Sequence, residues 1–236
     1  MLFRSTFIGT NYWYGAILGS KGKGGNRKRL NRELDEMKRL GINNLRILVG
    51  SDGEEGIKWK ASPVLQPSPG VYNDTILDGL DYLMLQLQRR GMVAVLYLNN
   101  SWEWSGGYGF YLENAGGGKA QQPNEVGYSA YVKYASQFAT NQKAQQLFFN
   151  HVNFILKRTN RYTGKPYTDD PAIMSWQICN EPRAFDKAAL SQFEAWLAKA
   201  ASIMKSIDKR HLVSIGSEGA FGCEVDYDSW QRICSD

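Results

Sequence analysis

Hydrophobic residues recur every three or four positions in several segments of the chain, which is typical of helices with one buried face. The segments with this pattern are residues 26–40, 73–90, 128–162 and 188–207. In the first of them Leu30, Leu34 and Met37 lie on one side, and Gly41 follows as a stop signal. Gly91 follows the second segment in the same way. Four helices are predicted.

Short, nearly continuous apolar runs alternate with these helices and predict strands that are buried on both faces. They cover residues 7–11, 44–49, 92–98, 172–178 and 211–215. Strands that alternate with helices at this spacing indicate a parallel sheet, which is an α/β fold.

Polar and aromatic residues gather directly after one strand following another. They are Asn11 to Tyr14, Arg46, Asn99 to Trp104, Asn180 with Glu181, and Ser217 with Glu218. Functional groups at the carboxyl ends of several strands are typical of a (β/α)8 barrel. The glycine-rich signatures of nucleotide-binding folds do not occur in the sequence.

Only five strands and four crossover helices are predicted, whereas a closed barrel has eight of each and ~250 residues. We therefore expect residues 1–236 to form one partial catalytic domain that holds roughly the first five strands of a TIM barrel. An open α/β sheet is the alternative.

The composition narrows the class of protein. With 43% hydrophobic and 22% charged residues, the 236-residue chain suits a globular domain. No run reaches the ~18 apolar residues of a membrane span, so no membrane partner is expected. The net charge of +5 comes partly from a basic cluster in residues 21–32, which lacks interleaved aromatics. It indicates a solvated helix face, so nucleic acid is not expected as a partner.

The cysteines Cys179, Cys223 and Cys234 and the two histidines have no metal-ligand spacing, so neither a metal nor a cofactor is expected. A Cys223–Cys234 disulfide is possible in an oxidising compartment, although unpaired thiols are the simpler interpretation of an odd total. The opening segment MLFRSTFIGTNYWYG has no signal-peptide pattern.

Aromatic residues make up 13% of the chain, and several lie in glycine-rich polar loops. A flat ring can cover the C–H face of a pyranose while amides and carboxylates bind its hydroxyls. This combination indicates a sugar-binding cleft.

The sharpest motif is Asn180-Glu181-Pro182, at the end of the apolar run 172–178. A carboxyl group at a strand end beside an amide fits a general acid in glycoside cleavage, which donates a proton to the glycosidic oxygen and later takes one from water. The alternative is a surface glutamate that caps the next helix.

This motif resembles the acid/base signature of glycoside hydrolase family 5, and the closer similarity is to the endo-β-1,4-mannanases of that family. Further segments carry the resemblance: residues 9–14 (GTNYWY), 40–46 (LGINNLR), 69–72 (PGVY), 99–107 (NNSWEWSGG), 170–176 (DPAIMSW) and 216–219 (GSEG). The resemblance implies endo-acting hydrolysis of β-1,4-mannosidic bonds in mannan, glucomannan or galactomannan, with retention of configuration.

The resemblance also implies three catalytic residues. Glu181 would be the acid/base, Asn180 would hold the 2-hydroxyl of the sugar at the cleavage point, and Arg46 would orient the nucleophile. Arg46 could instead form an ordinary salt bridge.

The substrate-binding residues implied by the resemblance surround this centre. Trp102 or Trp104 would stack on the bound mannan, and Arg183 and Glu218 would line the leaving-group side. Trp13 and Asn100 complete the set: Trp13, Asn100, Trp102, Trp104, Arg183 and Glu218. Trp13 could also simply pack at the mouth of the barrel.

A retaining mechanism needs a second carboxyl group as nucleophile. In the family this Glu ends the seventh strand, after a His-x-Tyr segment, and neither feature can be placed in the sequence. We therefore expect the nucleophile to be absent from the chain. Resident acids that could substitute are Glu218, Glu103, Glu113 and Asp52.

Two alternatives to a mannanase remain open: a non-catalytic mannan-binding fragment, and a related cellulase-type β-glucanase. The family and its polymeric substrate imply a secreted, monomeric protein whose partner is a mannan-type polysaccharide.

Overall fold

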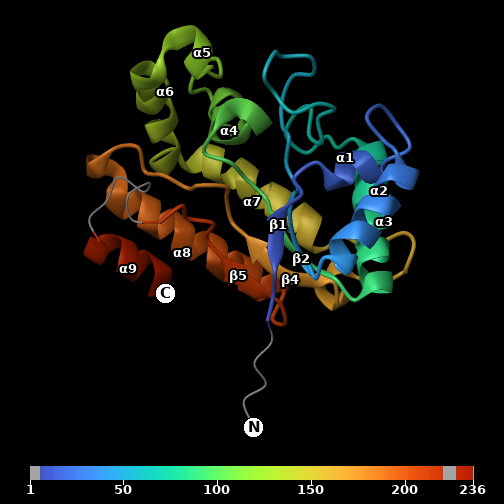
Figure 1. Cartoon of the computed structure of the whole chain (residues 1–236). Coiled ribbons are helices and arrows are strands. Elements are labelled where there is room, and N and C mark those ends of the chain that lie inside the picture. Colours follow the sequence, from blue (N-terminus) through green and yellow to red (C-terminus); the bar gives the residue numbers. More distant parts are fainter. Residues whose placement is uncertain (1–5, 220–226, 236) are drawn as a thin grey trace.

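Five parallel strands form one sheet in the order β1-β2-β3-β4-β5 (Figure 1). The computed structural model describes residues 6–219 and 227–235. The strands are β1 Gly9–Asn11, β2 Asn44–Leu48, β3 Val93–Tyr97, β4 Ile173–Gln177 and β5 Leu212–Ser214. Their positions confirm the five predicted strands and the α/β class.

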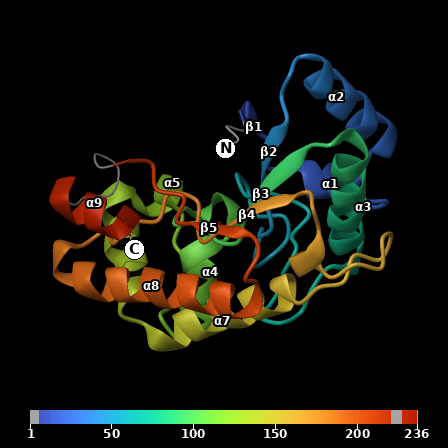
Figure 2. The same cartoon turned by 90° about the horizontal axis from the view of Figure 1, so that it is seen from below.

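Helices connect successive strands and cover the outside of the curved sheet (Figure 2). They are α1 Gly15–Gly19, α2 Arg27–Arg39, α3 Asp74–Arg90, α4 Gly107–Asn114, α5 Pro123–Val126, α6 Tyr128–Ala135, α7 Gln142–Leu156, α8 Leu190–Ile207 and α9 Tyr227–Ser235. Short 3-10 turns occupy Glu103–Ser105, Ser136–Ala139, Tyr167–Asp169 and Lys187–Ala189.

Local capping explains where the two best-predicted helices begin and end. The side chain of Asn26 accepts a hydrogen bond from the Arg29 N–H at the start of α2, and Asn73 does the same for Thr75 at the start of α3. Gly91 ends α3 with φ of 63°, a left-handed conformation that glycine adopts without steric cost.

The predicted helix over 128–162 is wrong as one element. It divides into α6, the turn Ser136–Ala139 and α7, because Asn141 accepts a hydrogen bond from the Ala144 N–H and caps a new helix. The segment after Leu156 is a loop in which Asn160 accepts hydrogen bonds from the N–H groups of Tyr162 and Thr163. Helices α1, α4, α5 and α9 were not predicted.

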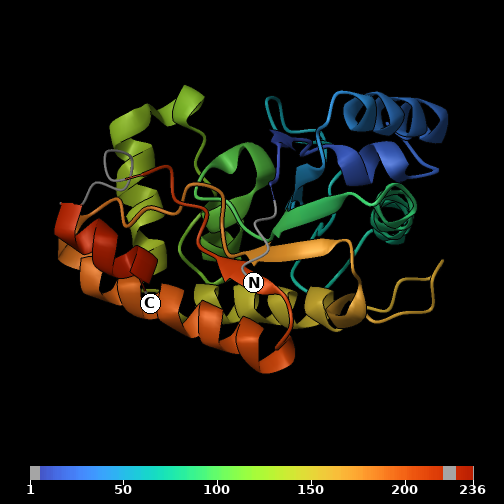
Figure 3. The ribbon, with the colours of Figure 1, turned by 60° about the horizontal axis from the view of Figure 1, so that its bottom comes forward.

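Helices α7 and α8 run side by side under the sheet, as Figure 3 shows. Trp196 of α8 is 1% exposed and packs edge-on against Phe138, with ring centroids 5.1 Å apart. The Trp176 indole of β4 donates to Asp208, at the end of α8, at 2.7 Å. The buried aromatic layer therefore fixes the helices to β4, which leads into the candidate site.

Helix α1 packs on α3 at a distance that only glycine permits. A Cβ atom on Gly79 would lie 2.1 Å from the Ala16 carbonyl oxygen, and one on Gly19 would lie 2.4 Å from the Gly79 carbonyl oxygen. This close approach holds the segment after β1 against the body of the protein.

A buried ion-pair cluster fastens the loop after α7 to α3. Asp81, which is fully buried, accepts hydrogen bonds from Arg158 at 2.6 and 2.9 Å, from Arg161 at 3.2 Å and from the Tyr167 hydroxyl at 2.6 Å. The cluster satisfies a carboxylate that would be costly to bury alone.

No helix in the described part of the chain is long and apolar enough to span a membrane. Cys179 is a buried free thiol. The possible Cys223–Cys234 disulfide lies outside the described residues, because Cys223 and the side chain of Cys234 are not among them.

Candidate active site

Glu181 lies just beyond the carboxyl end of β4, clamped between the segments that follow β3 and β5. Its N–H donates to the Gly216 carbonyl at 3.0 Å, and Ser101 donates a hydrogen bond to its carbonyl. Its φ of 49° lies in the left-handed region, which is uncommon for a residue other than glycine and occurs often at functional sites.

The indole of Trp102 holds the Glu181 carboxylate. Its Nε1–H donates to Oε2 of Glu181 at 2.6 Å. The indole is itself fixed, because it stacks on Tyr131 with centroids 5.8 Å apart and meets Phe185 edge-on at 5.5 Å. A bond to one carboxylate oxygen orients the group and leaves Oε1 for proton transfer.

Asn100 and Asn180 join the ends of β3 and β4. Asn180 donates to Oδ1 of Asn100 at 3.1 Å, and Asn100 donates to the Ser105 hydroxyl at 3.0 Å. The same Oδ1 accepts the Trp102 backbone N–H at 3.0 Å. Asn100 is 0% exposed. The geometry therefore gives Asn100 a positioning role behind Asn180 and Trp102, and its predicted contact with substrate stays a prediction.

Arg46 extends from β2 into the space enclosed by the sheet. Its Nε donates to Gln177 at 2.7 Å, its Nη1 donates to Asn11 at 3.4 Å, and its guanidinium lies 4.2 Å from the centroid of the Tyr97 ring. Burial lowers the pKa of Arg46, and the nearby Tyr97, Cys179 and Glu181 raise it. An arginine remains charged under these conditions, so the site keeps a fixed cation beside Glu181.

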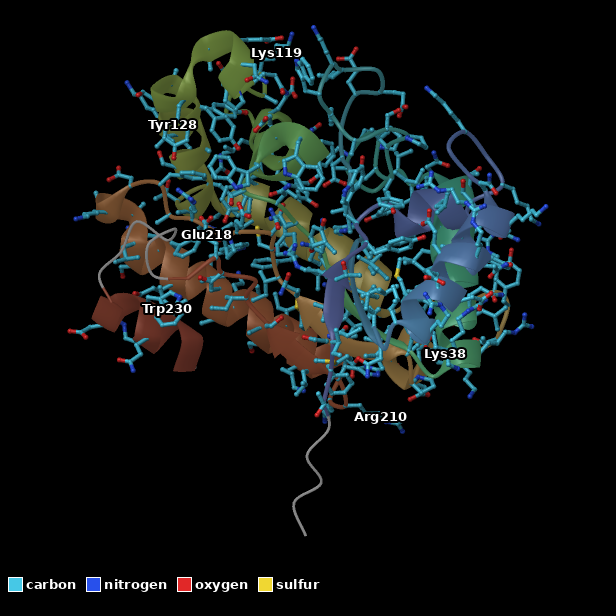
Figure 4. All side chains as sticks on the ribbon, in the orientation of Figure 1. Lys38, Lys119, Tyr128, Arg210, Glu218 and Trp230 are labelled. Carbon is cyan, nitrogen blue, oxygen red and sulfur yellow. The ribbon has the colours of Figure 1, made fainter. Side chains whose placement is uncertain are left out.

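Arg183 and Glu218 pair on the β4–β5 side of the site. Nε of Arg183 donates to Glu218 at 2.6 Å, and the guanidinium lies 5.1 Å from the Trp102 ring centroid. Figure 4 shows Glu218 above Arg210, which precedes β5 and marks the amino end of the strands. The structure thus brings these two predicted residues together with Trp102.

Trp13 and Trp104 form a second aromatic group, on the β1–β3 side. Their rings meet edge-on with centroids 5.7 Å apart, and Trp13 is 39% exposed. The predicted site residues therefore divide into Glu181 with its supports at the centre, the Arg183–Glu218 pair on one side and two tryptophans on the other.

The resident acids that could replace a missing nucleophile lie in other surroundings. Glu218 is engaged by Arg183, and Asp52 is buried within the β2–α3 loop with Gln66 donating to it at 3.3 Å. Glu103 and Glu113 line a separate cavity together with Lys60 and Lys119, and Glu181 is not among its lining residues. Among the described residues, no group of three or more His, Cys, Asp or Glu is placed to hold a metal ion.

Several supporting residues have no clear signal in the sequence. Tyr131 lies in α6, and its hydroxyl donates to the Ser101 carbonyl. Gln177 links Arg46 to the Ser214 hydroxyl, to which its amide donates at 3.2 Å. Of these residues only Gln177 could have been noticed in the sequence, because it is a polar residue within the apolar strand that leads into Glu181.

Two curated relatives of this chain come from plants. It is 35% identical over 182 residues to mannan endo-1,4-beta-mannosidase 4 of Oryza sativa subsp. japonica, covering 77% of this chain and 36% of that protein. It is 38% identical over 158 residues to mannan endo-1,4-beta-mannosidase 1 of Arabidopsis thaliana, covering 67% of this chain and 35% of that protein. The chain thus spans little more than a third of the length of these relatives.

Solved structures agree with the sequence relatives. A glycoside hydrolase family 5 mannosidase from Rhizomucor miehei superposes with a TM-score of 0.85 at 36% identity, covering 95% of this chain and 53% of that one. A mutant of that mannosidase was solved in complex with mannosyl-fructose, at a TM-score of 0.84, 36% identity and the same coverage of both chains. This match confirms the predicted barrel-type fold.

The family model for glycoside hydrolase family 5 beta-mannosidase-like proteins matches residues 4–236, which is nearly the whole chain. Together with the Glu181 geometry at the end of β4, this match confirms the resemblance drawn from the motifs. The chain belongs to glycoside hydrolase family 5, in its beta-mannosidase-like group.

Proposed function

We propose that this chain carries the acid/base part of an endo-acting β-1,4-mannan hydrolase. The observation that supports it best is the Glu181 carboxylate at the carboxyl end of β4, held by the Trp102 indole N–H at 2.6 Å. The names of the plant relatives support mannan as the substrate class. Mannan, glucomannan and galactomannan are all covered by the proposal.

By this proposal the Glu181 carboxyl donates a proton to the glycosidic oxygen as the bond to the leaving sugar breaks. The resulting carboxylate then removes a proton from water in the second half of the reaction. Asn180 hydrogen-bonds the 2-hydroxyl of the sugar, and Arg46 provides fixed positive charge next to the reacting carboxylates. The nucleophile that retention requires is assigned to none of the other described carboxylates.

An exo-acting β-mannosidase is the second candidate. It is favoured by the Rhizomucor miehei structure, which is described as a mannosidase and matches at a TM-score of 0.85. The two activities differ in product. An endo-acting enzyme lowers the viscosity of galactomannan early in the reaction, whereas an exo-acting one releases mannose with little change in viscosity.

Reducing-sugar release from galactomannan by the 236-residue chain, compared with Glu181→Gln, tests the proposal. Any activity that another carboxylate of the chain supports in place of the unassigned nucleophile should fall by 10²-fold or more in the variant, the usual range for a general acid. An aryl mannoside with a good leaving group needs little protonation, so the cleavage of its glycosidic bond, measured as kcat/KM, should suffer far less. An equal loss of kcat/KM on both substrates would contradict the acid role of Glu181.

Two further outcomes decide among the alternatives. A folded chain that binds mannan without cleaving it would favour a non-catalytic mannan-binding protein, and faster cleavage of a β-glucan would favour a cellulase-type enzyme.

Extracellular location and a monomeric state belong to the same proposal. Fractionation of the culture medium and size-exclusion chromatography test them.

A further inference from the structure

Trp59 is the most exposed large hydrophobic side chain of the described residues, at 69%. It lies in the loop between β2 and α3. An indole buries a large apolar area when it finds a partner, so leaving one in water forfeits a sizeable gain in stability. The ammonium of Lys58 lies over the ring, 4.9 Å from its centroid.

The backbone at Trp59 is also strained. The Lys60 N–H donates to the Ile57 carbonyl at 3.2 Å, which makes Trp59 the third residue of a tight turn. Its φ is 68°, a value that at this position of a turn favours glycine or asparagine. A bulky residue persists in such a conformation where the surroundings enforce it, and such positions cluster at ligand-binding sites.

The turn is pinned to the body of the protein on both sides. The Ala61 N–H donates to the Trp104 carbonyl at 2.6 Å, and the Ser51 hydroxyl donates to the Ala61 carbonyl at 2.9 Å. The carboxylate of Glu55 accepts the Val64 N–H at 2.7 Å. The turn that carries Trp59 is therefore held in place by hydrogen bonds on both sides, which lowers the entropy cost of binding a ligand.

The turn lies next to the aromatic side of the candidate active site, which Trp13 and Trp104 form. Trp59 lies two positions before Ala61, a span of at most ~7 Å. The Ala61 N–H donates to the carbonyl of Trp104, whose ring meets Trp13. In Figure 1 this loop rises at the same end of the molecule as α4 and α5, the end to which the strands point. Lys119, at that end in Figure 4, lines the cavity next to the turn.

Polar groups that suit sugar hydroxyls lie beside the turn. Ile57 and Lys60 of the turn line the cavity that Glu103 and Glu113 also line, with Phe110 as an apolar wall. Carboxylates and an ammonium can hydrogen-bond the hydroxyls of a pyranose whose C–H face a neighbouring exposed indole covers.

We infer that Trp59 forms an outer binding site for a β-1,4-linked hexopyranose chain. A long substrate reaches it by extending past Trp13 and Trp104. This side of the active site lies away from Arg183 and Glu218. The inference rests on the proposed function, because it needs a polysaccharide chain in the cleft. Such an outer site makes long polysaccharide chains bind more tightly than short ones.

Isothermal titration calorimetry with mannotriose and mannohexaose tests this site in the whole chain. Trp59→Ala should weaken mannohexaose binding about fivefold or more, the effect of losing a central aromatic contact, and leave mannotriose binding unchanged. Trp59→Tyr, which keeps a ring, should retain most of the affinity. Leu40→Ala is the matched control, since Leu40 is 58% exposed but precedes β2 at the opposite end of the strands.

Trp59→Gly separates binding from stability. Glycine tolerates the positive φ, so the variant should unfold at a temperature no lower than the parent chain while losing the same affinity as Trp59→Ala. A mannohexaose affinity unchanged in Trp59→Ala, or reduced equally by Leu40→Ala, would overturn the outer site alone. A parent chain that binds neither oligosaccharide would overturn the proposed function and this inference with it.

Discussion

The carboxylate of Glu181 depends on a neighbour 79 positions away, the indole N–H of Trp102. Trp102→Phe removes that donor and keeps a ring against Tyr131. A hydrogen bond to a charged group is worth about 1.5–3 kcal/mol. We therefore expect mannan hydrolysis to slow by roughly 10- to 100-fold, and cleavage of an aryl mannoside with a good leaving group to slow less.

Trp196→Phe is the matched control for this substitution, because the Trp196 ring packs on Phe138 in the buried aromatic layer and not on Glu181. It should leave the rate ratio between the two substrates unchanged. If Trp102→Phe slows both substrates equally, the indole contributes packing alone and does not position the proton donor.

At the same scale, the strand-end pattern was enough to predict the centre of the site but not its supports. Asn180 and Glu181 follow an apolar run, so the parallel sheet brings them to one edge. Arg46 does not follow its strand as expected but lies at the middle of β2, and its long side chain brings its charge to Gln177. The burial of Asn100 and the Tyr131 stack depend on contacts between segments far apart in sequence, for which no local pattern exists.

At the scale of elements, the loop after α7 is held to α3 by Asp81. Asp81→Ala leaves the partly buried Arg158 without its carboxylate, while Arg161 keeps its pair with Asp74, and the free energy of unfolding should fall by about 3–5 kcal/mol. Asp35→Ala is the matched control, since Asp35 pairs with Arg90 at 2.7 Å but is 66% exposed. That loss should be about 0–1 kcal/mol. Urea unfolding measures both, and similar losses would contradict the role assigned to the cluster.

Helices α2 and α3 share two features that made them predictable, a clear apolar period and a cap. Helix α3 has both, with Asn73 before it and Gly91 after it. The elements missed or misjudged lack one of them. Helix α1 is five residues long and begins and ends in glycine, so its stability comes from packing on α3. In the 128–162 segment the apolar period continues from α6 into α7, so it does not show that the helix is interrupted before the Asn141 cap.

At the scale of the whole molecule, the stability depends on pH through two buried titratable groups, one that joins α7 to the β2–α3 loop and one inside that loop. His151 of α7 contacts the Val49 carbonyl at 2.9 Å and the Tyr72 hydroxyl at 3.2 Å, and burial lowers its pKa to about 4. Burial raises the pKa of Asp52, in the same loop, to about 7, although the Gln66 hydrogen bond and the charge of Lys60 oppose the shift.

The two groups give opposite pH dependences. The folded state binds the Asp52 proton more tightly than the unfolded state, so Asp52 makes stability fall as pH rises from about 4 to 7. His151 is harder to protonate when folded, so its contribution is lost as pH falls from about 6.5 to 4. Between these limits the two contributions oppose each other.

Asp52→Asn should separate them. An amide can still accept the Gln66 hydrogen bond but carries no charge, so the variant should be more stable than the parent chain at pH 8, with the difference shrinking steadily toward pH 4.5. The variant keeps the His151 dependence, in which stability increases from pH 4 to 6.5, and the opposite dependence of Glu103 and Asp170, whose pKa values burial raises. Urea unfolding at four pH values across this range measures the difference. A constant difference at every pH would mean that Asp52 is not held protonated by burial, and that the loop is fixed by hydrogen bonds alone.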